Sequence, residues 1–273
     1  MTLRLVRVEL TVSDLDHAER FYVDGLGFAV ERRGVIDPAM ARLLGADQVT
    51  AVTLRRGGQT LVLQAFQPSG ARYPSGATSC DQIFQHFAVP VADMKAAYSR
   101  LQLVRPSPIS PAPQLLPASS GGVVAFKFRD PDGHPVELIQ FPDHHDDGID
   151  HSAIVVMDVA RSIDFYCDQL GFSVAARQIN TGLEQDRLDG LASVSVDVVA
   201  LEPERPTPHL ELLGYRNPPV RPTIRLASRD IGATRVVLEG AELPSGSVRL
   251  GDGSRAGLIH DPDGHAIVLI SHC

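Results

Sequence analysis

A short sequence pattern occurs four times along this chain, in two variants that alternate. In the first variant an aspartate precedes Phe-Tyr and then Leu-Gly-Phe, at 14–28 and again, with the same spacing, at 158–172. In the second variant Asp-Pro-Asp-Gly-His precedes a short apolar run, at 130–138 and at 261–269. Repeats decide the architecture of a chain, because each copy is one structural unit that packs against its neighbours. The chain is therefore expected to have two halves, each built from two related units.

The composition is that of a soluble globular protein. The chain has 273 residues, which gives room for two domains, and 44% of them are hydrophobic and 21% charged. The net charge of −8, with no basic run, argues against nucleic acid as a partner. No apolar stretch is long enough for a membrane span, and the alternating start of the chain lacks the apolar core of a signal peptide. Three scattered cysteines, Cys80, Cys167 and Cys273, are typical of free thiols, so a cytoplasmic location is expected.

Each unit begins with a predicted strand and a predicted helix. Alternation of polar and apolar residues predicts strands at 5–12, 86–91, 151–156 and 223–228. An aspartate follows each strand, at 14, 93, 158 and 230, and aspartate accepts hydrogen bonds from the free N–H groups of a helix start. Helices are therefore predicted at 15–25, 94–102, 159–170 and 231–239. With the short strands that follow, each unit has the order β-α-β-β-β, which is an α+β fold.

The units have approximate limits of 3–66, 80–141, 149–214 and 221–272. They form an N-terminal domain at 1–142 and a C-terminal domain at 149–273. The polar linker 142–148 contains His144 and His145 among three aspartates. It is either a surface metal site or, as we favour, a solvated connection. The proline-rich segment 104–122 is a long loop inside the second unit and a candidate to line or cover a site.

The two repeated runs resemble the vicinal oxygen chelate superfamily. This group includes glyoxalase I, methylmalonyl-CoA epimerase, extradiol ring-cleaving dioxygenases, and the fosfomycin- and bleomycin-resistance proteins. The resemblance rests on Asp before Phe-Tyr and Leu-Gly-Phe and on Asp-Pro-Asp-Gly-His before Glu-Leu, and it covers nearly the whole chain. It implies four βαβββ modules that form two cupped mixed β-sheets flanked by helices, with a divalent metal inside a cup. It does not imply one reaction, because this fold hosts many chemistries.

The resemblance also implies where the metal ligands lie. One position is the first-strand residue seven before the capping aspartate, and the other is a carboxylate central in the last strand. The inner units have a histidine and a glutamate there: His86 and Glu137 in the second unit, His151 and Glu211 in the third. The outer units have neither, since their residues are Arg7 and Val62 in the first unit, Thr223 and Val268 in the fourth.

These four ligands converge only if the second unit pairs with the third. If unit one paired with two, and three with four, each cup would contain one His and one Glu, too few for zinc or a facial-triad iron. The monomeric tandem glyoxalase I enzymes are similar in pairing inner with inner units, and this arrangement is favoured. Two imidazoles and two carboxylates around one ion suit Zn²⁺, Ni²⁺, Fe²⁺, Mn²⁺ or Co²⁺, with positions left for water or substrate.

The glutamates also have an interpretation that needs no metal. Strand alternation can turn Glu137 or Glu211 toward solvent, whereas a carboxylate that faces the core needs a cation or hydrogen-bond donors. Both glutamates lie in apolar strands at the implied positions, which favours metal ligation. His209 and Tyr215 flank Glu211. His209 shares its face, so it is either a supporting or acid–base group or an exposed residue at a strand end.

The outer cup is expected to bind no metal. Arg7 and Glu9 share one face of the first strand, and Arg225 lies on the corresponding face of the fourth-unit strand. Opposed arginine and glutamate predict a cup filled by ion pairs, and the alternative is an anionic effector held by the two arginines. His134 and His265, which follow the Asp-Pro-Asp-Gly turns, are expected to be surface residues that support the turn.

Three hypotheses for the function follow from the resemblance. The first, favoured by the two-His, two-Glu count, is a lyase, isomerase or epimerase in which Glu137 or Glu211 moves the proton next to a carbonyl of a small-molecule substrate. The second is an extradiol-type dioxygenase with Fe²⁺, although Thr223 and Val268 would replace two ligands of its usual site. The third is a binding protein without turnover, like the resistance members. No basic cluster in the inner cup suits a glutathione carboxylate, which argues against a glutathione adduct as substrate.

Overall fold

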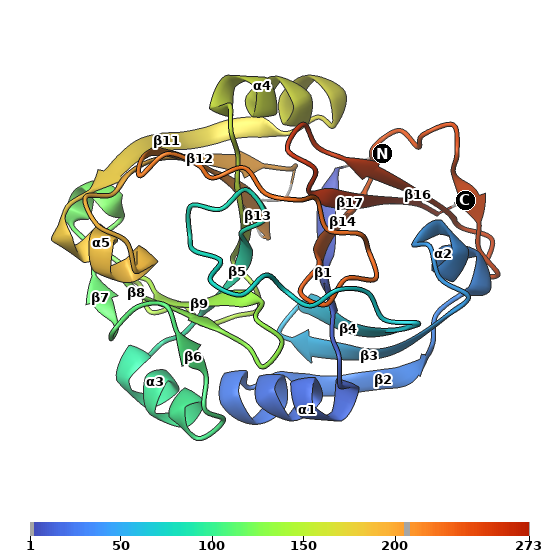
Figure 1. Ribbon diagram of the computed structural model, residues 1–273, viewed down its shortest axis with the longest axis horizontal. Helices are drawn as coiled ribbons and strands as arrows, with labels where there is room; N and C mark the ends of the chain where they lie inside the picture. Colours follow the sequence, from blue (N-terminus) through green and yellow to red (C-terminus); the bar gives the residue numbers. More distant parts are fainter. Residues whose placement is uncertain (1–2, 205–207, 273) are drawn as a thin grey trace.

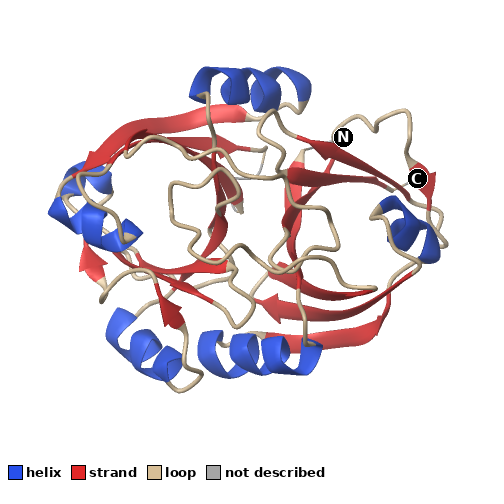
Figure 2. Cartoon of the chain, viewed as in Figure 1, coloured by secondary structure: helices blue, strands red, loops and turns tan. Residues whose placement is uncertain are grey.

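Two strongly curved β-sheets lie back to back in this computed structural model, which describes residues 3–204 and 208–272 (Figures 1 and 2). The sheet on the left of Figure 1, the inner sheet, has nine strands from units two and three. The sheet on the right, the outer sheet, has eight strands from units one and four. Each combines parallel and antiparallel pairs. The predicted fold class is confirmed, and inner units pair with inner and outer with outer.

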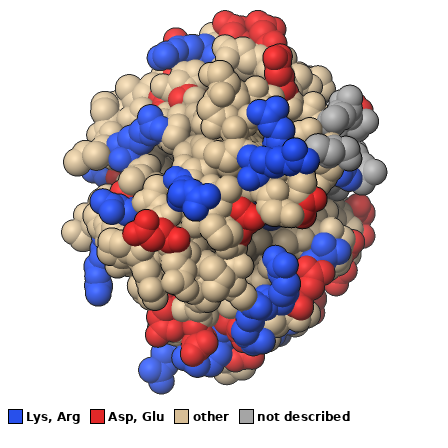
Figure 3. Space-filling view, turned by 90° about the vertical axis from the view of Figure 1, so that its right-hand side faces the viewer, with Lys and Arg blue, Asp and Glu red and all other residues tan. Residues whose placement is uncertain are grey.

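The outer sheet has the order β15-β16-β17-β14-β1-β4-β3-β2. Unit one supplies β1 (Arg4–Thr11), α1 (Leu15–Arg20), the π-helical turn Phe21–Gly25, β2 (Ala29–Val35), α2 (Pro38–Leu43), β3 (Gln48–Arg56) and β4 (Gln59–Gln67). Unit four supplies β14 (Thr234–Glu239), β15 (Val248–Arg249), β16 (Arg255–His260) and β17 (Ala266–Ser271). Acidic and basic side chains are interspersed over the face on this side of the molecule (Figure 3).

The inner sheet has the order β11-β12-β13-β10-β5-β9-β8-β6, and β7 pairs with β8. Unit two supplies β5 (Gln85–Pro90), α3 (Met94–Gln102), β6 (Ser107–Pro108), β7 (Gln114–Leu115), the 3₁₀ turn Ala118–Ser120, β8 (Val124–Arg129) and β9 (Pro135–Gln140). Unit three supplies β10 (His151–Val155), α4 (Val159–Asp164), the π-helical turn Phe165–Gln169, β11 (Ser173–Thr181), α5 (Leu183–Asp189), β12 (Ser195–Glu202) and β13 (His209–Asn217). Among the described residues, no helix is long and apolar enough to span a membrane.

Three of the four predicted helix starts are confirmed. The carboxylates of Asp14, Asp93 and Asp158 each accept a hydrogen bond from the backbone N–H three residues later, at 2.9, 3.0 and 3.1 Å. These bonds satisfy N–H groups that a helix start leaves without a partner. The Leu-Gly-Phe runs end two of these helices, because Gly27 and Gly171 adopt φ of 75° and 85°, which a side chain disfavours. The repeated pattern is therefore a helix with a defined beginning and end.

The prediction for unit four is wrong at its start. Residues 231–239 contain the strand β14 instead of a helix, and the predicted strand 223–228 is irregular. The β-branched residues Thr234, Val236 and Val237 favour a strand. The Asp230 carboxylate caps no helix, since it accepts from the backbone N–H groups of Ala227 and Ala71 at 2.7 and 2.8 Å.

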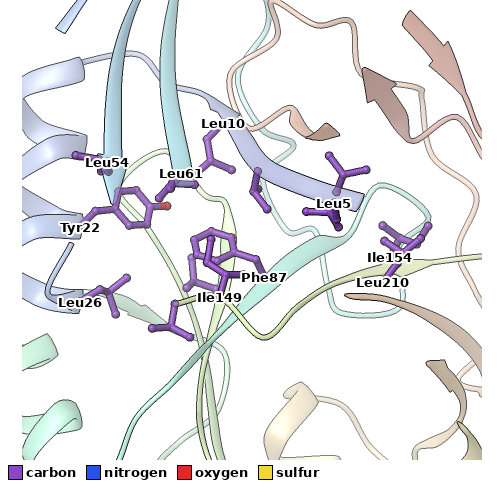
Figure 4. Close-up of a cluster of buried hydrophobic side chains, with 14 of the residues drawn as sticks. Leu5, Leu10, Tyr22, Leu26, Leu54, Leu61, Phe87, Ile149, Ile154 and Leu210 are labelled. Atoms are coloured by element: carbon purple, nitrogen blue, oxygen red, sulfur yellow. The ribbon is translucent and has the colours of Figure 1, made fainter. Parts of the chain in front are cut away.

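The main core lies between the convex faces of the two sheets (Figure 4). Leu10 and Leu61 come from the outer sheet, Phe87 and Ile154 from the inner sheet, and Tyr22 from the helical segment that covers one end. Successive strand residues point to opposite faces. The residues between these core positions therefore point to the concave face of each sheet. We call the concave face of the inner sheet the inner cup and that of the outer sheet the outer cup.

The Asp-Pro-Asp-Gly turns tie each last strand to the helix of the preceding unit. Asp130 accepts from the Tyr22 hydroxyl at 2.8 Å and from His134 Nδ1 at 2.9 Å. In the other half, the Tyr166 hydroxyl donates to Asp261 at 3.1 Å, and the ring of His265 contacts the Val155 carbonyl. Both histidines are buried. The expectation of surface residues is therefore wrong. The His134 ring supports its own turn as predicted, whereas the His265 ring contacts strand β10 instead of its turn.

Replacing Tyr22 with phenylalanine should reduce the free energy of unfolding by about 1–3 kcal/mol, because the buried Asp130 carboxylate loses a donor. Urea denaturation measures the change. Tyr98→Phe is the matched control, since the Tyr98 ring packs on Phe126 with centroids 4.8 Å apart and should lose less than about 0.5 kcal/mol. Equal losses in the two variants would show that the bond to Asp130 contributes nothing.

Candidate metal centre

The four predicted ligand residues line one cavity of about 260 Å³ in the inner cup. His86 lies on β5 and His151 on β10, and these two strands pair antiparallel at the middle of the sheet. Glu137 lies on β9, beside β5, and Glu211 on β13, beside β10. The two units therefore contribute equivalent pairs from either side of an approximate twofold axis.

Three of these four side chains form a compact cluster. Ligand atoms of His86, Glu137 and His151 all lie within 4.8 Å of one another, and all three residues are buried. His86 Nε2 is 2.8 Å from Glu137 Oε2. Glu211 approaches from the other side, with its Oε2 3.6 Å from His151 Nε2. The structure brings the four residues together, with Glu211 beside the cluster rather than at its centre.

The histidine His151 is oriented by its chain neighbour. Its Nδ1 is 2.8 Å from Asp150 Oδ2, while its buried Nε2 has no hydrogen-bond partner among the described residues. A carboxylate on one ring nitrogen fixes the proton there and leaves the other nitrogen with a free lone pair, as in metal-bound histidines. This arrangement fits a metal ion at Nε2. Asp150 was not among the predicted site residues, because the repeated pattern marks the ligand positions and not the residues that orient the ligands.

Electrostatics in the cluster are dominated by carboxylates. Burial opposes protonation of His151, but the charges of Glu211, Asp150 and Glu137 outweigh it and raise the pKa of His151 to about 9. Burial likewise opposes ionisation of Glu211, yet His151 and His209 lower the pKa of Glu211 to about 2. Burial lowers the pKa of His86. The site therefore attracts positive charge, which a divalent cation would supply more fully than a proton on His151.

His209 and Lys127 extend the site on either side. His209 Nε2 lies 3.7 Å from Glu211 Oε1 and the side chain is mostly buried, which favours the supporting role over that of an exposed strand-end residue. Lys127 on β8 faces Glu137 in the strand pairing, and its buried Nζ donates to Asp189 at the end of α5 at 2.7 Å. Lys127 was not among the predicted site residues. Its signal was the same as for Glu137, a charged residue inside an apolar strand.

Two connecting segments were also candidates for a role in a site. Leu116, Ser120 and Gly121 of the proline-rich segment line the cavity, so this segment does form part of its wall. The linker histidines His144 and His145 are exposed. In the described part of the chain, neither joins a group of three possible metal ligands.

The strand pairing in unit four shows which residue there corresponds to His86. His86 lies two residues before the β5 position that pairs with Glu137. In unit four, Val237 of β14 pairs with Val268, and Arg235 lies two residues before Val237. Arg235 therefore corresponds to His86. Thr223, predicted to hold this place, instead accepts a hydrogen bond from a backbone N–H at the start of unit two. The error follows directly from the wrong helix at 231–239.

Arg235 fills the floor of the outer cup with polar contacts. Its guanidinium, fully buried, donates to Gln64 Oε1 at 2.8 Å and Thr11 Oγ1 at 3.0 Å, and lies 3.5 Å from Glu9 Oε2. Arg7 donates to the other oxygen of Glu9 at 2.8 Å. The outer cup thus contains the predicted arginine–glutamate pairing, with Arg235 as the central arginine. The alternative of Arg7 with Arg225 loses its basis, because the two arginines line separate pockets.

Comparisons with known proteins agree with this architecture. Glyoxalase I from Zea mays aligns over 99% of this chain and 92% of its own, with 18% identity and a TM-score of 0.65. A protein from Bacillus subtilis, provisionally described as a dioxygenase, aligns over 99% of this chain and 85% of its own, with 13% identity and a TM-score of 0.64. At such identities the likeness concerns the fold alone. A sequence search of curated proteins finds no significant match.

A family model provides the assignment. The model of the Glyoxalase/Bleomycin resistance protein/Dioxygenase superfamily matches residues 4–138 and 148–269, which is most of both halves. The two matched segments meet near the linker between units two and three, as the sequence repeat requires. The chain therefore belongs to the Glyoxalase/Bleomycin resistance protein/Dioxygenase superfamily.

Proposed function

We propose that this protein is a divalent-metal-dependent, glyoxalase-like enzyme of the lyase, isomerase or epimerase type. It acts on a small carbonyl compound at one metal site between units two and three. The proposed metal ligands are His86, Glu137, His151 and Glu211. The observation that carries the proposal is the convergence of His86, Glu137 and His151 within 4.8 Å in a buried cavity.

The donor set defines the chemistry that the site supports. Two imidazoles and two carboxylates suit Zn²⁺, Ni²⁺, Fe²⁺, Mn²⁺ or Co²⁺. Such an ion, when bound, supplies Lewis-acid stabilisation of the negative charge that develops on a carbonyl oxygen. Glu137 is held by His86 in the buried cluster, whereas Glu211 is partly exposed and lies beside His209. Glu211 is therefore the better placed of the two to take the proton from the adjacent carbon and return it.

A ring-cleaving dioxygenase is the second candidate. His86, His151 and Glu137 are a two-His, one-carboxylate set, the combination that binds non-haem Fe(II) in many oxygenases. This candidate uses the inner cup, since the corresponding unit-four positions hold Arg235 and Val268, and neither side chain is a metal donor. Oxygen consumption with a catechol would favour it over the lyase, and ligand binding with no turnover at all would favour a sequestering protein.

Elemental analysis of protein purified without chelator tests the proposal. We expect about one divalent ion per chain, retained on gel filtration and removed by a strong chelator. A hydroxamate, which resembles the enolised form of a hydroxycarbonyl compound, should bind the metal-loaded protein and not the stripped protein. Protein that takes up no divalent ion under any loading condition would contradict the proposal.

Replacing Asp150 with asparagine should weaken metal binding about 10–100-fold, because His151 loses the carboxylate that orients its ring. Titration against a competing chelator measures the affinity. Asp143→Asn is the matched control, since Asp143 makes a similar 2.7 Å contact to His145 in the exposed linker. Loss of affinity in both variants, or in neither, would contradict the assigned role of Asp150.

A further inference from the structure

We propose that the inner cavity selects substrates that are uncharged away from the reacting carbonyl and carry a hydrogen-bond donor, a hydroxyl or amide N–H, at their far end. The inference rests on the proposed function, because it takes the cluster around His151 as the reacting end. Three features of the cavity support it: its charge balance, its unpaired polar atoms, and the placement of those atoms along the sheet.

In the described part of the chain, no unpaired lysine or arginine lines the cavity to bind an anionic group on the remote part of a substrate. Lys127 is the one lysine or arginine that lines it in the described part of the chain, and its Nζ is already paired with Asp189 at 2.7 Å. The lining also includes the carboxylates of Glu137, Asp150 and Glu211. A carboxylate or phosphate on the remote part of a substrate would lose its hydration without a compensating charge, which is strongly unfavourable.

The unpaired polar atoms around the cavity are mainly hydrogen-bond acceptors. Asn180 Oδ1 and Gln185 Oε1 are buried and have no hydrogen-bond partner among the described residues. The buried Tyr215 hydroxyl lies beside the Asp189 carboxylate, which only accepts, so the Tyr215 oxygen remains an acceptor toward the cavity. The orientation of Gln185 is fixed, because its Nε2 donates to Asp189 Oδ2 at 2.8 Å and a carboxylate only accepts. Its free atom is therefore the oxygen. Buried acceptors favour a ligand that brings donors to them.

Asn180 and Tyr215 lie on the part of the cavity wall that β11, β12 and β13 form beyond Glu211. Asn180 on β11 pairs with Val196 on β12, which pairs with Tyr215 on β13. The row therefore crosses three adjacent strands at one level. Tyr215 is four residues beyond Glu211 on the same strand, roughly 13 Å along the strand and on the same face. Gln185 on α5 faces the same cavity. A substrate that reaches the cluster with its carbonyl can extend toward this row.

Two probes that differ only at one end test the inference. Both are monohydroxamates of suberic acid, one ending in a carboxamide and the other in a carboxylate. Zinc is titrated first, alone, by calorimetry, and each probe is then titrated into the zinc-loaded protein. We expect the carboxamide to bind about tenfold more tightly or better, since only it can donate to the acceptor row.

The variant Asn180→Leu tests the acceptor row itself. The preference for the carboxamide should fall several-fold, and the free energy of unfolding should not decrease, because Asn180 Oδ1 has no protein partner to lose. Asn180→Lys should move the preference toward the carboxylate. Gln169→Leu, on the exposed end of the unit-three helix, is the control and should leave the preference unchanged.

The outcomes separate this inference from the proposed function. If zinc binds and the carboxylate probe binds equally or better, the inference is overturned while the metal site stands. If Asn180→Leu keeps the full preference, the assigned acceptor row is wrong. If neither zinc nor any other divalent ion binds in the first titration, the proposed function has failed, and the inference fails with it.

Discussion

Protein with His151 replaced by alanine should contain about tenfold less divalent metal than the wild type, or lower still. The buried Nε2 of His151 has no hydrogen-bond partner among the described residues, and His151 lies between the donors of unit two and those of unit three. Without His151, the proposed ligands that remain are the imidazole of His86 and the carboxylates of Glu137 and Glu211. Elemental analysis after gel filtration measures metal per chain. Any metal-dependent turnover should fall in parallel.

The exposed His17 on α1 provides the control for this variant. His17→Ala should retain the full metal content, because its side chain is remote from the cavity lining. The double variant His86→Ala with His151→Ala should contain almost no metal. If metal content persisted near the wild-type level in the double variant, the ion would lie outside the inner cup, and the proposed site would be wrong. Metal content near two per chain that persists in the double variant would contradict the expectation that the outer cup binds none.

Replacing Arg235 with methionine should lower the free energy of unfolding by about 3–5 kcal/mol, because it leaves a buried carboxylate short of a partner. Burial opposes ionisation of Glu9, but the charges of Arg7 and Arg235 outweigh it, so the pKa of Glu9 lies below its usual value. Arg235 also holds Gln64 and Thr11 in place. Chemical denaturation measures the loss.

Two further variants show how much of the stability loss in Arg235→Met comes from the unpaired Glu9 carboxylate. Arg7→Met should cost less, since Arg7 is partly exposed and Glu9 keeps Arg235. In the double variant Arg235→Met with Glu9→Met, most of the stability should return, because apolar side chains replace both buried charges. Full stability in Arg235→Met alone would show that the outer cup does not depend on this network.

The repeat predicted the fold best where each copy preserves its local chemistry. Asp14, Asp93 and Asp158 cap helices because they precede runs that favour helix, and Gly27 and Gly171 end the first and third of these helices. Asp230 precedes Thr234, Val236 and Val237, whose branched side chains favour a strand, and so the copied pattern failed there. Predicting Thr223 at the outer-cup position was a consequence of that failure.

The repeated pattern was enough to predict the four metal ligands but not the residues that support them. His86, Glu137, His151 and Glu211 occupy equivalent places in units two and three, and the short linker makes their pairing possible. Asp150 and Lys127 do not recur at equivalent positions of the repeat. Their roles follow from side-chain contacts to His151 and Asp189, which sequence spacing does not reveal. The division into domains at 1–142 and 149–273 follows the linker and stays a prediction. Each sheet combines one unit that precedes the linker with one unit that follows it.

Anomalous diffraction from crystals of the zinc- or nickel-loaded protein tests the central claim most directly. We predict one strong peak per chain, in the inner cup, bonded to His86, Glu137 and His151 with Glu211 completing the protein ligands. A peak in the outer cup near Arg235, a peak at the linker histidines, or a fully loaded crystal with no peak between β5 and β10 would contradict the account.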